Sequence, residues 1–172
     1  MSNDVKNGTL PAIKCLIVRL QKASLILPLN LMAELVDGET LSPSAHPGVE
    51  GWLHWRNRQI PVVSLESLCM LEEEGNAGEG KCLILHTLSP MSGLPFIALR
   101  VQGSLNTLEI QPDTLRDDHS GNEQRCPYVA RQVRASHLLC FIPDMPAIEA
   151  VVAEILQLTT EQAQPVSDEG EG

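Results

Sequence analysis

The sequence has few aromatic side chains, few basic side chains and no long apolar segment. Phe, Trp and Tyr make up 3% of its 172 residues, so the core must be built mainly from Leu, Ile and Val. Lys and Arg number 12 against 22 Asp and Glu, which gives a formal net charge of −10. Because that charge repels phosphate backbones, nucleic acid is not expected as a partner. The most apolar window, residues 25–36, contains Pro28, Asn30 and Glu34 and is too short to cross a bilayer, so no membrane insertion is expected.

Motifs that carry catalytic or phosphate-binding chemistry are also missing. The sequence contains no GxGxxG, no GxxxxGK[ST] and no GxSxG. The five histidines stand far apart, and His86, four residues after Cys82, lies on an expected strand where that spacing is no metal signature. Asp117 and Asp118 are expected to form a solvated turn rather than an acid–base pair. The sequence therefore predicts no metal, no cofactor and no enzymatic activity.

The five cysteines occur singly, without a CxxC pair. Most of them are expected to be small core residues of a protein in a reducing compartment. The N-terminus has neither the basic start nor the apolar run of a secretory signal, so the cytoplasm is the expected location. A small β-barrel enzyme with a Cys–His nucleophile pair assembled in three dimensions stays open as the alternative function.

What the sequence does contain is a succession of short, mostly apolar runs that predict β-strands. These runs are 13–20, 23–27, 33–36, the two arms of 51–65, 82–87, 94–101, 104–110, 128–134 and 137–142. Many short strands are typical of a sandwich or barrel rather than of a parallel sheet. A Glu- and Gly-rich linker at 72–81 divides the strands into two groups.

The segment 51–65, GWLHWRNRQIPVVSL, predicts a hairpin. Asn57 is expected at its tip because Asn tolerates the left-handed backbone that a tight turn requires. Trp52 and Trp55 are an odd number of residues apart, so one should face the core and the other should face out. Since interfaces are enriched in Trp and Arg, one Trp and Arg56 are predicted to belong to a docking surface. The alternative, that both tryptophans only flank the core, stays open.

One segment, PAIEAVVAEILQLTTEQ at 146–162, predicts an amphipathic helix. Its apolar residues recur with the spacing of one buried helix face, at Ile148, Val151, Val152, Ile155 and Leu156. Asp144 is expected to cap its first turn. The helix is expected to cover a barrel opening, with docking of a partner as the alternative. Residues 1–11 are predicted to be a flexible lead-in and 163–172 a disordered acidic tail.

An ordered pattern runs through residues 15–68. The runs CLIVRL and SLILPL are followed by MAELV at 32–36, the Pro-rich loop SPSAHPGVEG, and then Gly51, Arg56, Ile60-Pro61-Val62-Val63 and Leu65. This order and spacing resembles the CheW-like family, the small adaptor domain of bacterial chemosensory arrays. Two positions depart from the family pattern: Asn57 replaces a glycine, and Ser64 replaces the usual acid.

The resemblance implies an all-β fold with a C-terminal helix, built as two five-stranded β-barrel lobes around a shared apolar core. It implies one domain over 12–162, with lobe one at about 12–75 and lobe two at about 81–142. Glu34 and Arg56 would fall near the groove where partners of the family dock. Together with the hairpin argument, the predicted partner-binding residues are Glu34, Leu35, Val36, Trp52, Trp55, Arg56 and Asn57.

The function implied by the resemblance is non-enzymatic. The protein would be a scaffold or adaptor that couples a methyl-accepting chemoreceptor tip to the regulatory domain of a CheA-type histidine kinase. Such a two-component pathway would control chemotaxis or pilus-based twitching motility. Whether the protein acts as a monomer, self-associates or joins rings with other barrels is left open by the sequence.

Overall fold

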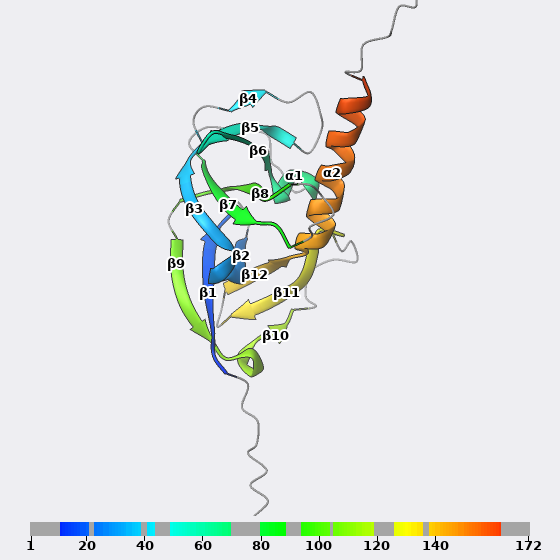
Figure 1. Ribbon diagram of the computed structural model, residues 1–172. Coiled ribbons are helices and arrows are strands. Elements are labelled where there is room, and N and C mark those ends of the chain that lie inside the picture. Colours follow the sequence, from blue (N-terminus) through cyan, green and yellow to red (C-terminus); the bar gives the residue numbers. More distant parts are fainter. Residues whose placement is uncertain are drawn as a thin grey trace, which may run out of the picture.

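A computed structural model describes most of the chain between its two ends (Figure 1). The described residues are 11–20, 23–38, 41–43, 49–69, 80–88, 94–103, 105–118, 126–135 and 138–162. The expected lead-in up to residue 10, the tail from residue 163 and nearly all of the 72–81 linker lie outside them. No described helix is long and apolar enough to cross a membrane.

The strands form two six-stranded sheets, which lie one above the other in Figure 1. Sheet one has the order β3-β7-β8-β6-β5-β4. Its strands are β3 (Met32–Asp37), β4 (Ser42–Pro43), β5 (Val49–Trp55), β6 (Arg58–Val63), β7 (Lys81–His86) and β8 (Phe96–Val101). Neighbouring strands are antiparallel, except that β6 pairs with β8 in parallel.

Sheet two has the order β10-β11-β12-β2-β1-β9. Its strands are β1 (Ile13–Arg19), β2 (Ser24–Pro28), β9 (Leu105–Ile110), β10 (Arg116–Asp117), β11 (Val129–Ala135) and β12 (Leu138–Pro143). All pairs are antiparallel except β12 with β2. The helical elements are the 3-10 turns η1 (Leu29–Leu31) and η3 (Pro112–Thr114), the single turn α1 (Leu65–Leu68) and the long helix α2 (Met145–Gln162).

The predicted fold class, all-β with a C-terminal helix, is confirmed. Beyond the five strands expected for each lobe, each sheet carries one additional strand of two residues, β4 or β10. The expected division of the lobes near residue 75 is wrong. After β2 the chain leaves sheet two, builds all of sheet one from β3 to β8, and returns to sheet two at β9. The 72–81 linker therefore connects α1 to β7 and does not separate the lobes, because strand pairing is decided by contacts distant in sequence.

Three apolar clusters hold the sheets together, since the strands of each sheet bury residues on both faces. The central cluster draws on both sheets and α2, and includes Leu16, Val18, Leu25, Leu27, Leu83, Leu85, Ile97, Leu99 and Ile148. The other face of sheet one buries a second cluster, called the sheet-one cluster below, which consists of Leu53, Ile60, Val62, Cys82, Ile84 and Ala98. The other face of sheet two buries Cys15, Ile26, Ile110, Val133 and Cys140. The shared apolar core expected between two lobes is the central cluster.

Helix α2 packs on the central cluster along the face that the sequence predicted. Ile148 and Val152 are fully buried, and Val151, Ile155 and Leu156 are partly buried against the same cluster. The carboxylate of Glu149 is also fully buried and accepts a hydrogen bond from the backbone N–H of Leu88 at 2.5 Å.

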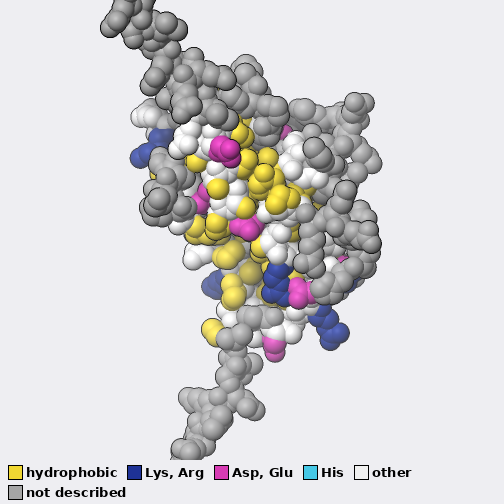
Figure 2. All heavy atoms as spheres, turned by 90° about the vertical axis from the view of Figure 1, so that its right-hand side faces the viewer, with side chains coloured by type: hydrophobic (Ala, Val, Ile, Leu, Met, Phe, Trp, Pro, Cys, Tyr) yellow, Lys and Arg dark blue, Asp and Glu magenta, His cyan; other side chains and the backbone are white. Residues whose placement is uncertain are grey.

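The first turn of α2 is capped as expected. Asp144 accepts a bond from the N–H of Ala147 on Oδ1, at 3.1 Å. On the outward side of the helix, Pro146 and Ala150 are exposed. Figure 2 shows this side of the molecule, with apolar side chains gathered over its middle.

Candidate functional site

The tip of the β5–β6 hairpin is a two-residue turn made by Arg56 and Asn57. Both residues have left-handed backbones, with φ of 46° and 61°, and Trp55 pairs with Arg58 on either side of them. Asn57 takes the conformation that the sequence predicted. The left-handed backbone of Arg56 was not predicted, because a positive φ is uncommon for a long side chain. A turn with two positive φ values matches the twist of the strands it joins.

Glu34, Trp55 and Arg56 meet at this tip and are called the Glu34 cluster below. Glu34 Oε2 accepts a hydrogen bond from Trp55 Nε1 at 2.7 Å and one from Arg56 Nη2 at 3.3 Å. The Arg56 guanidinium carbon lies 4.6 Å from the centre of a Trp55 ring, within the range of a cation–π contact. The side chains of Arg56 and Glu34 are 70% and 41% exposed. An ion pair this exposed contributes about 0–1 kcal/mol to stability, so the fold does not depend on it.

A bulge in β3 places Glu34 in this cluster. The register of β3 against β7 shifts between Met32 and Glu34. Strict alternation would put those two residues on one face, but the extra residue turns Glu34 to the opposite face. That face is shared by Ala33 and Trp55, which both pack on the sheet-one cluster. Because β3 is an edge strand and β5 lies four places away in the sheet, the Glu34–Trp55 bond shows that sheet one curls back on itself.

An aromatic layer lies under the Glu34 cluster. The rings of Trp55 and Phe96 meet edge to face, with their centres 5.1 Å apart. The Phe96 ring also contacts the ring of His86, whose centre lies 5.1 Å from its own. Arg58 approaches the Phe96 ring at 5.8 Å. Phe96, His86 and Arg58 are not among the partner-binding residues predicted from the sequence. Phe96 lies on β8, 41 positions from Trp55, and no local pattern signals that contact.

The remaining predicted site residues have different surroundings. Leu35 packs partly buried on the central cluster, and Val36 packs on the sheet-one cluster. Trp52 is half-buried on β5 opposite Pro61, and alternation puts it on the other face from Trp55. Asn57 is exposed at the turn. The structure thus brings Glu34, Trp55 and Arg56 together beside Asn57, while Leu35 and Val36 help to hold β3 in place.

The far end of sheet one contains a second polar contact, around Arg100. Its Nε donates to Glu50 Oε2 at 2.8 Å, and its Nη1 donates to the carbonyl oxygen of Gly38 at 3.0 Å. Beside it lies Cys82, which is fully buried. Burial raises the pKa of the Cys82 thiol above its usual value, and the nearby Arg100 only partly offsets this. A thiol held in its protonated form is a poor nucleophile.

The two adjacent acids Asp117 and Asp118 are ion-paired. Arg131 Nη2 lies 2.7 Å from Asp117 Oδ1, and Arg134 Nη2 lies 2.7 Å from Asp118 Oδ2. These contacts tie β10 and the residue after it to β11. Among the described residues, no three His, Cys, Asp or Glu side chains gather in a way that could hold a metal ion.

Nearly all of these strands and helices lie in the part of the chain that matches a known protein family. A model of the CheW-like domain matches residues 14–166. The chain belongs to the CheW-like domain family. The match extends well beyond residues 15–68, where the sequence carries the recognisable pattern, and includes all of α2 and both sheets except the first residue of β1.

A solved structure supports the same fold. The scaffolding protein TtCheW from Thermoanaerobacter tengcongensis superposes with a TM-score of 0.64 at 15% identity, over 84% of this CheW-like chain and 91% of TtCheW. At that identity the likeness is evidence of the fold alone. A comparison with curated protein sequences finds no significant match.

Proposed function

We propose that this CheW-like protein is a cytoplasmic, non-enzymatic adaptor that couples a chemoreceptor to a CheA-type histidine kinase. The output would be chemotaxis or pilus-based twitching motility. Family membership supports the general role, and the similar TtCheW is itself described as a scaffolding protein. The observation that carries the proposal is the Glu34 cluster, in which a charged pair rests on a Trp ring at the surface.

The Glu34 cluster suits protein recognition for physical reasons. Trp and Arg are the residues most enriched among those that dominate binding energy at interfaces. The Arg56 guanidinium is 70% exposed, so it is accessible to a carboxylate or carbonyl of a partner. Because Glu34 and the Trp55 ring fix its position, Arg56 loses little side-chain freedom when a partner binds. Charged groups of this kind select partners more than they add raw affinity.

The alternative function, an enzyme with a Cys–His pair, has less support. Three cysteines are not in a disulfide, namely Cys15, Cys82 and Cys140, and all three are buried. Burial raises the pKa of both Cys15 and Cys82, which opposes formation of the reactive thiolate. His86 is exposed on β7, and its ring packs on Phe96.

Reversal of the charge at Arg56 is expected to reduce partner binding. In Arg56→Glu, two carboxylates would face each other at the turn and the cation over Trp55 would be lost. We expect at least a tenfold weaker interaction with a kinase regulatory domain or a receptor tip from the same organism, measured by co-purification and then by calorimetry. Arg131→Glu is a matched control, because Arg131 is also exposed and ion-paired but lies on sheet two. Its binding should equal that of the wild type.

Two outcomes would count against the proposal. The adaptor role fails if the wild-type protein captures neither fragment from its own host. The proposed site fails if Arg56→Glu binds as well as the wild type does. The double variant Glu34→Arg/Arg56→Glu refines the result: recovery of binding means that the pair shapes the surface, and continued loss means that Arg56 contacts the partner itself.

A further inference from the structure

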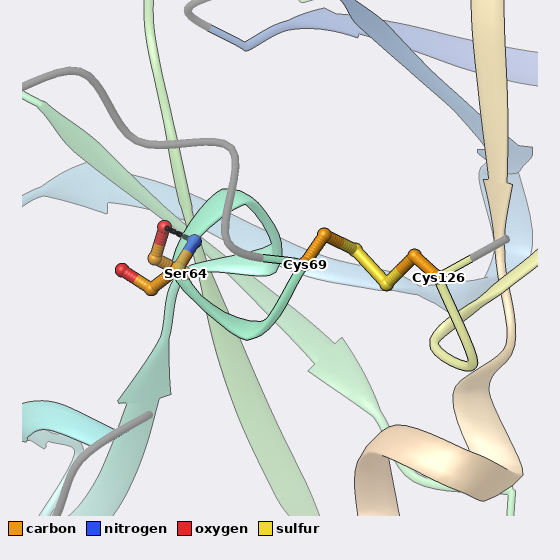
Figure 3. The surroundings of a disulfide bond; sticks show 4 residues. Ser64, Cys69 and Cys126 are labelled. Carbon is orange, nitrogen blue, oxygen red and sulfur yellow. Dashed lines mark hydrogen bonds between the residues drawn. A yellow bond between two sulfur atoms is a disulfide. The ribbon is translucent and has the colours of Figure 1, made fainter. Parts of the chain in front are cut away.

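A disulfide joins two segments that belong to different sheets. Cys69 follows α1, which continues from β6 of sheet one, and Cys126 lies shortly before β11 of sheet two. The two residues are 57 positions apart, and their Cα atoms are 5.2 Å apart. Figure 3 shows Cys69 leaving the single turn of α1 toward Cys126. The expectation that most cysteines are small core residues is confirmed for the other three, which are buried and outside any disulfide, but the spacing of Cys69 and Cys126 gave no sign of a pair.

The disulfide secures a corner where three elements meet. On one side, Ser64 caps α1 by accepting a bond from the N–H of Ser67 at 3.2 Å. On the other side, the carbonyl of Cys126 accepts a bond from the N–H of Val129 at 3.1 Å, and the carbonyl of Tyr128 accepts one from the N–H of Asp144 at 2.9 Å.

Asp144 in turn caps α2. The disulfide is therefore the covalent link between α1 and the segment that supports both the start of β11 and the first turn of α2.

The position of the pair allows chemical exchange. Cys69 and Cys126 are each partly exposed, whereas the other three cysteines are buried. Thiol–disulfide exchange requires access of an attacking thiolate to one sulfur, and exposed disulfides are the more easily reduced class. In a reducing compartment, a disulfide that does form is usually transient and has a catalytic or redox-sensing role.

We propose that the Cys69–Cys126 disulfide forms and breaks reversibly with the redox state of its surroundings, and we call it the redox latch below. When the bond is formed, the corner made by α1, β11 and α2 is more ordered than when it is broken. This inference rests on the proposed cytoplasmic location. Two molecules of a low-molecular-weight thiol such as glutathione open the latch. The first thiolate attacks one sulfur and forms a mixed disulfide, releasing the other cysteine as a thiol. The second thiol then displaces the remaining cysteine, so that the protein gains two thiols and one oxidised glutathione is released. Excess oxidised glutathione reverses both steps.

The test uses the full chain alone, without denaturant. The protein is equilibrated in glutathione buffers of decreasing GSH:GSSG ratio, its free thiols are alkylated, and the labelled positions are read by mass spectrometry. We expect Cys69 and Cys126 to become labelled together in reducing buffer and to be protected again in oxidising buffer, while Cys15, Cys82 and Cys140 stay unlabelled. Hydrogen exchange should rise on reduction at 65–69, 126–129 and the first turn of α2, and stay constant in β7.

The double variant Cys69→Ser/Cys126→Ser provides the control. It should exchange like the reduced protein in every buffer. The latch is refuted if the pair resists glutathione until denaturant is added, if it fails to re-form under oxidising conditions, or if exchange at the corner is the same in both states. Since no partner is present, these outcomes are independent of whether the protein binds a kinase or a receptor.

Discussion

Ending the chain at Asp144 is expected to unfold the protein, because α2 is part of the central cluster. Met145, Ile148 and Val152 are buried in the central cluster, which also contains residues of both sheets. At about 1.5–3 kcal/mol for each buried side chain, their loss removes about 5–9 kcal/mol. A domain is stable by only about 5–15 kcal/mol in total, so the remainder should lack a cooperative transition. Thermal melting monitored by near-UV circular dichroism shows whether the shortened chain has a cooperative unfolding transition.

Two matched variants separate a covering role of α2 from a docking role. A chain that ends at Gln162 keeps α2 and should melt like the full protein. Ala150→Lys changes only the exposed outer side of the helix and should fold normally, so any loss of partner binding in this variant reveals a docking contribution. If the chain that ends at Asp144 keeps a sharp melting transition and loses only partner binding, α2 is a docking element and the covering role is wrong.

Removal of the Cys69–Cys126 disulfide is expected to lower stability by about 3–4 kcal/mol. The bond closes a loop between residues 57 positions apart, and a loop of that length restricts the unfolded chain by about 4 kcal/mol in the chain-entropy model. For a chain of this size, the melting temperature should fall by about 10 °C. Neither Cys69 nor Cys126 is among the buried residues of the three apolar clusters, so the reduced protein should remain folded.

Melting of the wild type with and without dithiothreitol, beside Cys69→Ser/Cys126→Ser, measures the contribution of the bond. Reductant should shift the wild type to the melting temperature of the variant and leave the variant unchanged. Equal melting of all the samples would mean that the disulfide adds no stability to the fold.

The secondary structure was largely predictable because its signals are local. The hairpin at 51–65, the turn at Asn57 and the apolar stripe of 146–162 depend on residues close together in the sequence, and the structure has each of them. The helix cap at Ser64 is another local feature, since it joins residues three positions apart. Ser64 stands where the family pattern has an acid, and its hydroxyl caps α1. Ser and Asp are comparably good helix caps.

The pairing of strands was not predictable from the same signals. Nothing near β1 and β2 indicates that they pair with β9 and β12 rather than with β3. The same limit applies to the Glu34 cluster. The resemblance selected Glu34 and Arg56, but the bulge that turns Glu34 toward Trp55, and the layer beneath it, depend on the register of β3 against β7 and on Phe96 of β8.

The central claim, that the protein binds a kinase through the Glu34 cluster, is tested most directly by the fluorescence of Trp55. The chain has two tryptophans, so Trp52→Phe leaves Trp55 as the single reporter within the cluster. Titration with a tryptophan-free regulatory domain of the kinase should change Trp55 emission in a saturable way, and Arg56→Glu in the same background should abolish the change. Binding detected by calorimetry without any change in Trp55 emission, or no binding at all, would contradict the account.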